Sequence, residues 1–179
     1  AGALATDTAD LNLNLRSSVA TLASIDTILV FFDEGRPYDP ALADHFRRSS
    51  MATNFLQNVG TYEYLKSIGL RIVRSDSLRS QLSRYYEYDV QYLSDIEKEF
   101  VNGNWVDAMK PQMMQKFSYQ FFFGPATPRD YESLRRDPEY RTVLTTTREA
   151  LEWKDRRSQI VLTAAEDLLG ALYAELEGR

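Results

Sequence analysis

The chain has 179 residues, of which 44% are hydrophobic and 12% aromatic, and this is enough to bury a core and fits one domain. Its formal net charge is -5, and its 21 Lys and Arg residues are spread along the chain. Nucleic acids are bound mainly through neutralised phosphates, so this charge pattern argues against a nucleic-acid partner. The absence of cysteine excludes disulfides, thiolate metal sites and cysteine nucleophiles, and it fits a reducing or an oxidising compartment.

No apolar run approaches the roughly 18 to 20 residues of a membrane span, and no signal-peptide pattern opens the sequence. The first residues, AGALATDTAD, are typical of a processed or shortened N-terminus. Such a start is compatible with removal of a targeting or membrane segment before Ala1.

A long helix is predicted over residues 4–34. Seven of nine positions at alternating steps of four and three are apolar, which is typical of a heptad seam: Leu4, Thr8, Leu11, Leu15, Ser18, Leu22, Ile25, Leu29 and Phe32. Such a helix would be roughly 45 Å long, so it needs a partner of similar length. Gly35 and Pro37 are predicted to end it.

The expected partner is a helix over residues 138–177. Asp137 is predicted as its N-cap and Pro138 as its first helical residue. Its seam has the same spacing: Tyr140, Leu144, Thr147, Leu151, Lys154, Ser158, Val161, Ala165, Leu168 and Leu172. The polar seam residues Thr8, Ser18, Thr147, Lys154 and Ser158 are interpreted as register-setting or edge positions rather than as a polar site.

Shorter helices are predicted between the two long ones, over residues 40–48, 61–68, 76–101, 105–117 and 129–136. Gly69 is predicted to end the second of these with a positive φ, and Leu70, Ile72 and Val73 are predicted to enter the core. A terminator or kink is expected at residues 102–104, and Pro111 is expected to interrupt the helix that follows.

No alternating run of strand length occurs in the sequence. The predicted fold class is therefore all-α, as one helical bundle over residues 1–179. Its long N- and C-terminal helices form an antiparallel pair, and the shorter helices pack across this pair.

The stretch over residues 61–92 carries a recognisable motif. Its spacing resembles the bacterial family catalogued as domain of unknown function 6090, in which a Tyr-x-x-Leu-x-Ser-x-Gly element and an apolar pair precede a Leu-Arg-x-x-Leu helix that enters a Tyr-Tyr pair. The matching residues are Tyr62, Leu65, Ser67, Gly69, Leu70, Ile72, Leu78, Arg79, Leu82, Tyr85 and Tyr86. Weaker likeness extends to the first heptads and to residues 130–134, 137–141 and 151–154. Ile68 departs from the small residue that usually follows the serine.

The resemblance implies a location. Members similar to this chain carry one membrane helix ahead of the first heptads, with the remainder outside the cytoplasm. It therefore implies a periplasmic, extracytoplasmic domain anchored to the inner membrane by a helix before Ala1, which this sequence lacks. The family has no established catalytic residues, so the resemblance implies none here.

The residues that usually carry catalysis are poorly placed. His45 is the only histidine, so neither a zinc site with a second imidazole nor a Ser-His triad has its ligands. The carboxylate pairs Glu97/Glu99 and Glu166/Asp167 are two apart or adjacent, so they point in different directions on a helix. No catalytic residue, metal site or cofactor is predicted, and the chain is predicted not to be an enzyme.

A tyrosine and arginine cluster is the candidate ligand site. In one interpretation Tyr85 and Tyr86 line a pocket in which Arg79 clamps an anion. In the other, both rings are core residues and Arg79 pairs with a carboxylate such as Asp89 or Glu87. If Asp89 is buried, it needs a donor, and an arginine or a tyrosine hydroxyl is the expected one.

Phe121, Phe122 and Phe123 form a candidate contact surface, because three consecutive rings cannot all face one core. The alternative is a loop folded over the end of the bundle. The leading hypothesis is a module for protein contact or self-association, with a homo-oligomer as one form. The second hypothesis is a sensor-like domain that binds a small anionic or aromatic ligand near the Tyr/Arg cluster.

Overall fold

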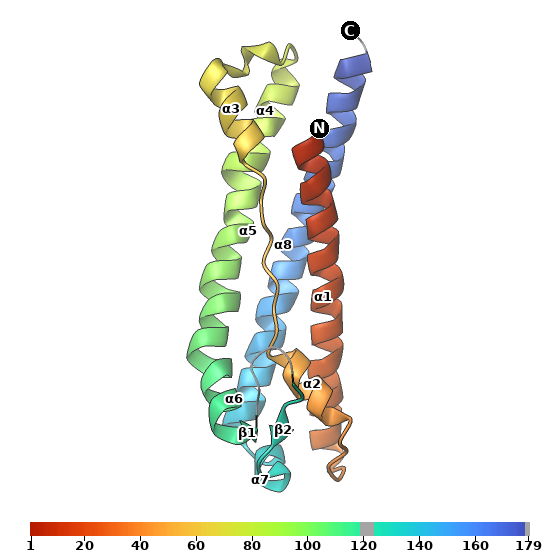
Figure 1. The fold of residues 1–179 in the computed structure, drawn as a ribbon, viewed down its shortest axis with the longest axis vertical. Helices are drawn as coiled ribbons and strands as arrows, with labels where there is room; N and C mark the ends of the chain where they lie inside the picture. Colours follow the sequence, from red (N-terminus) through yellow and green to blue (C-terminus); the bar gives the residue numbers. More distant parts are fainter. Residues whose placement is uncertain (119–123, 178–179) are drawn as a thin grey trace. The chain divides into compact units, whose positions relative to one another are not determined.

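The computed structural model describes residues 1–118 and 124–177, and the described fold is all-α, as predicted (Figure 1). The α-helices are α1 (Gly2–Asp33), α2 (Leu42–Ser49), α3 (Gly60–Ile68), α4 (Asp76–Arg84), α5 (Val90–Ile96), α6 (Lys110–Lys116), α7 (Tyr131–Arg135) and α8 (Pro138–Glu177). A 3-10 turn, η1, covers Leu70–Ile72, and π-helical turns cover η2 (Tyr85–Asp89), η3 (Glu97–Asn102) and η4 (Trp105–Met109).

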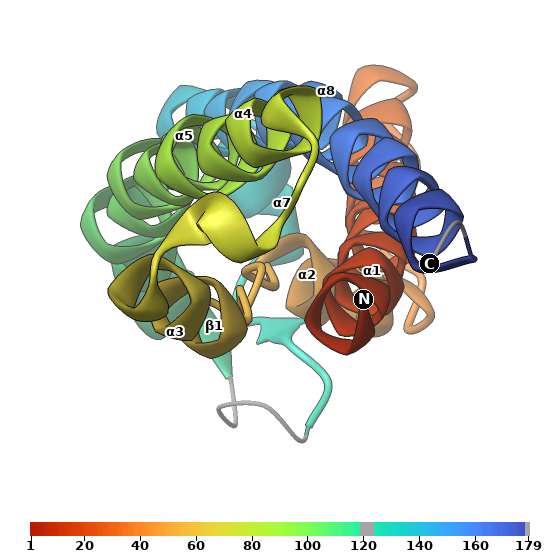
Figure 2. The same cartoon turned by 90° about the horizontal axis from the view of Figure 1, so that it is seen from above.

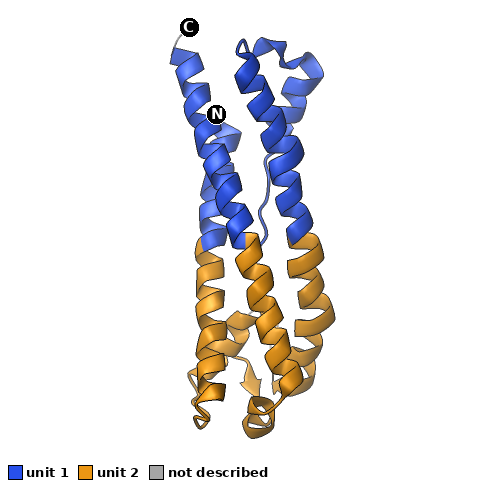
Figure 3. Ribbon diagram, turned by 180° about the vertical axis from the view of Figure 1, so that it is seen from behind, with its two compact units in different colours: residues 1–15, 54–96, 155–179 blue, residues 16–53, 97–154 orange. Residues whose placement is uncertain are grey.

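The chain divides into two compact units (Figure 3). Unit 1 consists of residues 1–15, 54–96 and 155–179, and unit 2 consists of residues 16–53 and 97–154. The helices α1 and α8 contribute residues to both units, and each unit has a hydrophobic core of its own. The prediction of one domain over residues 1–179 stays a prediction.

Unit 2 has an aromatic core. The Phe46 ring of α2 lies 5.0 Å from Phe117 and 6.4 Å from both Phe32 of α1 and Tyr140 of α8, measured between ring centroids. All the angles between these ring planes are tilted, a geometry that aromatic pairs favour over direct face-to-face stacking. These rings join α1, α2 and α8 around one centre.

Ion pairs show the direction of α1 and α8 within unit 2. Arg141 Nη1 lies 2.7 Å from Asp33 Oδ1, and Arg148 Nη1 lies 3.4 Å from Asp26 Oδ1. Residue numbers rise along α1 as they fall along α8, so the two helices are antiparallel, as predicted. Within unit 1, α1 and α8 share a core that includes Leu11.

The buried face of α1 differs from the predicted seam. Leu4, Leu11, Ser18, Ile25 and Phe32 are buried as expected. The intervening buried positions are not Thr8, Leu15, Leu22 and Leu29, which are only half-buried, but their predecessors Asp7, Asn14, Thr21 and Ile28. The heptad spacing is right, but one of its two rows was placed one residue too late because three buried residues of that row are polar. In α8, eight of the ten predicted seam residues are buried, and Thr147 and Leu172 are half-buried.

Residues 51–59 have no regular secondary structure, so their backbone groups need partners from elsewhere. In unit 2, Thr21 Oγ1 donates to the Met51 carbonyl at 3.3 Å, and Lys154 Nζ donates to the Thr53 carbonyl at 3.2 Å. In unit 1, Asp10 Oδ2 accepts from the Leu56 N–H at 2.9 Å. Polar side chains of the two long helices thus hold this extended segment.

Helical hydrogen bonding is unbroken from Asp76 to Lys116. Of the two alternatives predicted at residues 102–104, a terminator or a kink, the terminator is wrong, because Gly103 lies within the helix. Pro111 lacks an N–H, and its ring crowds the carbonyl of Asp107, four residues earlier. The wide π turn η4 directly precedes this point, and π turns are one way in which a helix continues past such a defect.

One short β-pair is an exception to the prediction that no strand occurs. Strand β1 (Phe117–Ser118) pairs antiparallel with β2 (Thr127–Pro128), with Phe117 opposite Pro128. The predicted contact surface of Phe121, Phe122 and Phe123 lies outside the described residues.

The turn after α3 is only partly as predicted. Gly69 has φ 93°, so its positive φ is confirmed. Val73 is buried, whereas Leu70 is half-buried and Ile72 is exposed. None of the residues of the 3-10 turn is buried, and Val73, which follows the turn in an extended conformation, is the one that reaches the core.

Helix α1 has the length and composition of a membrane span. An 18-residue window has a mean hydropathy of 1.5 with no more than two charged residues, and this is the one such helix in residues 1–118 and 124–177. The sequence-based expectation that no segment approaches a span is therefore wrong for α1. The same values also suit a core helix, and 39% of the window is buried within the protein.

Candidate functional site

The paired tyrosines of the candidate site are core residues of unit 1. Tyr85 and Tyr86 begin the π turn η2 and are both buried, with their ring centroids 4.8 Å apart and their planes nearly perpendicular. The Tyr62 ring of α3 stacks on Tyr86 at 4.6 Å with an interplanar angle of 14°. The three rings fill space, so the core interpretation of the two tyrosines is the one that the packing supports.

Asp7 of α1 is bonded to this cluster. Its side chain is 0% exposed, and its Oδ1 accepts from the backbone N–H and from Nδ2 of Asn58, each at 2.9 Å. The Tyr85 hydroxyl donates to Asp7 Oδ2 at 3.2 Å. Asp7 therefore joins α1, the extended segment and η2 through one carboxyl group.

Burial governs the ionisation of Asp7 and Tyr85. Desolvation raises the pKa of Asp7 above its ordinary value, although the bonds from Asn58 and Tyr85 act in the opposite direction. The pKa of Tyr85 is also raised, first by desolvation and then by the Asp7 charge. The Tyr85 hydroxyl thus keeps its proton and acts as a donor.

Glu87 forms a second polar contact with the tyrosine cluster, through Tyr62. The Tyr62 hydroxyl donates to Glu87 Oε1 at 2.8 Å, and Lys66 Nζ pairs with the same oxygen at 2.8 Å. The hydrogen bond from Lys66 and then that from Tyr62 lower the pKa of Glu87. These contacts attach α3 to η2.

Asp89 is buried and has the arginine donor that its burial was predicted to need. Arg157 of α8 donates through Nη2 to Asp89 Oδ1 at 2.6 Å and to the Asp89 carbonyl at 3.3 Å. The Arg157 guanidinium also lies 4.8 Å from the Tyr92 ring centroid and 5.7 Å from that of Tyr88. Arg84 Nε adds a longer contact to Asp89, at 3.7 Å.

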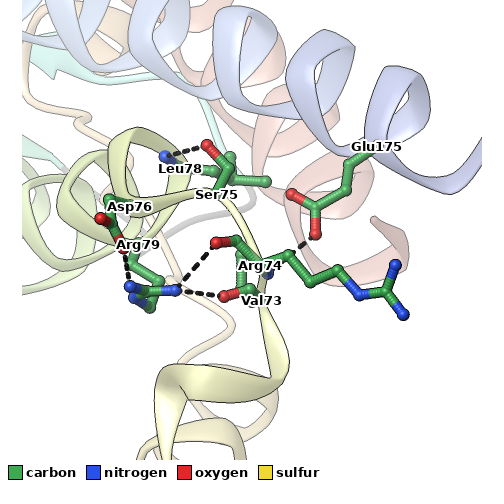
Figure 4. Close-up of polar contacts among 7 residues, drawn as sticks. All are labelled: Val73, Arg74, Ser75, Asp76, Leu78, Arg79 and Glu175. Carbon is green, nitrogen blue, oxygen red and sulfur yellow. Dashed lines mark hydrogen bonds and ion pairs between the residues drawn. The ribbon is translucent and has the colours of Figure 1, made fainter. Parts of the chain in front are cut away.

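Arg79 is used elsewhere in unit 1 (Figure 4). Its Nη1 donates to the Val73 carbonyl at 2.6 Å and to the Arg74 carbonyl at 3.1 Å, and its Nη2 pairs with Asp76. The predicted pairing of Arg79 with a carboxylate is confirmed, but the partner is Asp76 rather than Asp89 or Glu87. The guanidinium closes the turn between η1 and α4, and none of these three partners is one of the paired tyrosines.

A shallow hollow of about 200 Å³ does lie beside two of the candidate residues. Tyr85 and Asp89 contribute to its wall, together with Gln81, Arg84, Ile160, Ala164, Asp167 and Leu168. Of the predicted site residues, the structure thus brings Tyr85, Tyr86 and Asp89 together around η2.

The remaining candidates for metal binding and catalysis lie apart from one another. Within residues 1–118 and 124–177, no group of three His, Asp or Glu side chains is placed to hold a metal ion. His45 Nδ1 lies 3.2 Å from Ser24 Oγ in unit 2. The carboxyl groups of Asp7 and Asp89 are both bonded to donors of the protein itself.

Asp7, Asn58 and Arg157 are residues of the site that the sequence did not predict. Asp7 has a signal in the sequence, because Asp7, Asn14 and Thr21 are seven residues apart and parallel Leu4, Leu11 and Ser18. Asn58 lies in an irregular segment and Arg157 beside a seam residue, so neither has a comparable signal.

No protein-family model, curated protein or solved structure matches the chain. The resemblance to domain of unknown function 6090 therefore stays a prediction from the motif over residues 61–92.

Proposed function

We propose that this chain is a non-enzymatic helical module that acts through protein contact, by self-association. The observation that carries the proposal is an exposed apolar surface in unit 1, the leucine surface, formed by Leu13 (59% exposed) and Leu56 (75% exposed). Because the Leu56 N–H bonds to Asp10, and Leu13 is one helical turn after Asp10, both leucines border the same part of α1. Val59 extends the exposed apolar area along the segment.

The polar groups near η2 support a structural role for the site. Asp7, Asp89 and Glu87 each accept hydrogen bonds from at least one side chain of another element. A general base or a nucleophile needs access to a substrate, whereas Asp7 and Asp89 are buried. The arrangement favours a scaffold that presents surfaces over one that performs a reaction.

Self-association is tested by measuring the molar mass by light scattering across a concentration series. We expect the mass to rise with concentration. In a symmetric dimer each substitution is present on both sides of the contact, so Leu13→Ser combined with Leu56→Ser should move the midpoint at least about tenfold higher in concentration.

The matched control is Val106→Ser with Met114→Ser, which removes two exposed apolar side chains from unit 2. It should leave the midpoint unchanged. A wild-type chain that stays monomeric at every concentration would contradict self-association.

The second candidate function is a sensor-like domain that binds a small anionic or aromatic ligand. The observation in its favour is the hollow beside Tyr85 and Asp89, where the Arg84 side chain is 77% exposed. A thermal-shift screen with small anions separates this candidate from the first, because stabilisation that Arg84→Gln abolishes would support a ligand site.

We also propose that the chain lies outside the cytoplasm as part of a protein anchored to the inner membrane. Support comes from the resemblance over residues 61–92. The hydropathy of α1 is compatible with membrane attachment but equally suits a core helix. Fractionation of the full-length protein tests this, since recovery from the soluble cytoplasmic fraction would contradict it.

A further inference from the structure

The turn between α3 and α4 exposes apolar side chains at one end of unit 1. We call residues 64–74, from the second half of α3 through Gly69 and η1, the basic tip. Tyr64 is 63%, Ile68 51% and Ile72 55% exposed. Tyr64 and Ile68 are four residues apart on α3, so they share one face of that helix.

The basic tip also carries positive charge. Its charged residues are Lys66, Arg71 and Arg74, and no acidic residue occurs between positions 64 and 74. Lys66 is paired with Glu87. Across the described residues, no ion pair is recorded for the guanidinium of Arg71 or Arg74, whereas the total charge of the chain is -5.

The nearby carboxylates are those of Glu63, Asp76 and Glu175, and the charge of Glu63, one helical turn before Lys66, acts on Lys66. Asp76 pairs with Arg79, and Glu175 Oε1 accepts from the backbone N–H of Arg74 at 3.0 Å. In Figure 4 the Arg74 guanidinium extends away from these contacts, and no dashed line reaches it. Arg74 is exposed, so its charge is accessible to a partner.

The rest of unit 1 holds the basic tip in place. Tyr62 is the one buried residue of α3, and it fixes the helix by stacking on Tyr86 and by donating to Glu87. Arg79 bonds to the carbonyls of Val73 and Arg74 where the tip ends. Figure 2 shows the chain leaving α3 and turning into α4 at this end.

We propose that the basic tip docks on the headgroup region of an anionic lipid bilayer. Isoleucine and tyrosine side chains insert at the boundary between headgroups and acyl chains, while arginines stay at the level of the lipid phosphates. A stable protein interface buries about 800 Å² on each partner, which three side chains on a narrow turn do not supply. Shallow insertion into lipid has no such requirement.

The test is co-sedimentation of the whole chain with vesicles at low ionic strength. One set of vesicles is purely phosphatidylcholine, and the other contains about one-third phosphatidylglycerol. We expect binding to the anionic set only, weakened by added salt. Each arginine near an anionic surface contributes about 1 kcal/mol, so Arg71→Gln with Arg74→Gln should weaken binding about thirtyfold.

The apolar part of the basic tip is tested by Ile68→Ser with Ile72→Ser, which should weaken binding at least about tenfold. The charge-matched control is Arg48→Gln with Arg156→Gln, because both arginines are exposed outside the tip. The apolar control is Val106→Ser with Met114→Ser. Both controls should bind as the wild type does.

A fluorescence measurement reports on the tip directly. Tyr64→Trp should show a blue-shifted tryptophan emission on adding anionic vesicles, compared with the wild type, which contains Trp105 and Trp153 in unit 2. The proposal is overturned if the wild type does not bind anionic vesicles, in which case an acidic protein surface is the remaining occupant. Equal binding by all the variants would overturn it as well. Loss of self-association in the leucine-surface variant would leave this result unaffected.

Discussion

Asp7 is the residue at which three parts of unit 1 meet, so its acceptor oxygens should decide much of the stability of that unit. Asp7→Leu leaves the Asn58 N–H, the Asn58 side-chain amide and the Tyr85 hydroxyl without their acceptor. A buried donor without a partner costs about 1 to 3 kcal/mol, so we expect a loss of about 3 kcal/mol or more in the free energy of unfolding. Urea denaturation at neutral pH measures it.

Two further variants make this prediction specific to the hydrogen bonds. Asp7→Asn keeps a carbonyl oxygen for Asn58 and removes the buried charge, so it should change the free energy of unfolding by no more than about 1 kcal/mol. Asp26→Ala removes an exposed carboxylate of the same helix, where an ion pair contributes about 0 to 1 kcal/mol. If Asp7→Leu were as mild as Asp26→Ala, the role assigned to Asp7 would be wrong.

For Asp89, the sequence predicts that a hydrogen-bond donor is needed but not which residue supplies it. The need of a buried Asp89 for a donor, an arginine or a tyrosine hydroxyl, follows from the energy of desolvation, and that expectation is confirmed by Arg157. Which arginine supplies the donor depends on tertiary contact. Arg157 is 68 positions away in the chain, whereas Arg79, only ten positions away, bonds instead to the turn beside it.

At the scale of elements, heptad spacing predicted the extent of α1 and α8 well but placed one row of α1 incorrectly. An apolar count favours Leu15, Leu22 and Leu29 over Asn14, Thr21 and Ile28, although the second set is the buried one. The reason lies outside α1, because the irregular segment over residues 51–59 needs polar partners, and Asp7 and Thr21 provide them. The residue pattern of one helix does not reveal that another segment of the chain needs hydrogen-bond partners.

Gly69 sets the geometry of the element that carries the basic tip. Its φ of 93° and ψ of 119° lie in a region that residues with a Cβ rarely adopt. A Cβ at Gly69 would meet no atom within 4 Å, so Gly69→Ala tests backbone strain alone. We expect a loss of about 1 to 3 kcal/mol in the free energy of unfolding, measured by urea denaturation.

The matched substitution Gly170→Ala should change the free energy of unfolding in the opposite direction to Gly69→Ala. Gly170 lies within α8, and an added Cβ there also meets no atom within 4 Å. Alanine is favoured over glycine inside a helix by about 0.5 to 1 kcal/mol, so Gly170→Ala should stabilise the protein. Equal effects of the two substitutions would contradict the assignment of strain to Gly69.

For the whole molecule, the fold class and the antiparallel terminal helices could be predicted because they follow from local periodicity over thirty or more residues. The continuity of the helix from Asp76 to Lys116 could not be predicted, because Gly103 and Pro111 are usual signals of helix ends. Tertiary packing outweighs these signals, and π turns before Gly103 and Pro111 absorb the mismatch. The two cores likewise depend on contacts between distant segments.

The balance between raised and lowered pKa values predicts how the stability of the whole molecule depends on pH. The folded-state pKa of Asp7 is raised above the ordinary value of 3.8, so folding binds a proton there, and stability increases as the pH falls from neutral through that pKa. The pKa values of Glu87 and Asp137 are lowered by Lys66 and Lys116, respectively. Their contributions are present above the ordinary values of 4.5 and 3.8 and are lost as the pH falls through the folded-state values.

We therefore expect the free energy of unfolding to pass through a maximum on the acid side of neutrality and to fall at lower pH. Urea denaturation at constant ionic strength, at steps of half a pH unit between pH 7.5 and pH 3 or thereabouts, measures this profile. Asp7→Asn has no proton to bind, so it should abolish the rise between neutral pH and the maximum while retaining the fall below it. A rise that persisted in Asp7→Asn would show that another group causes it.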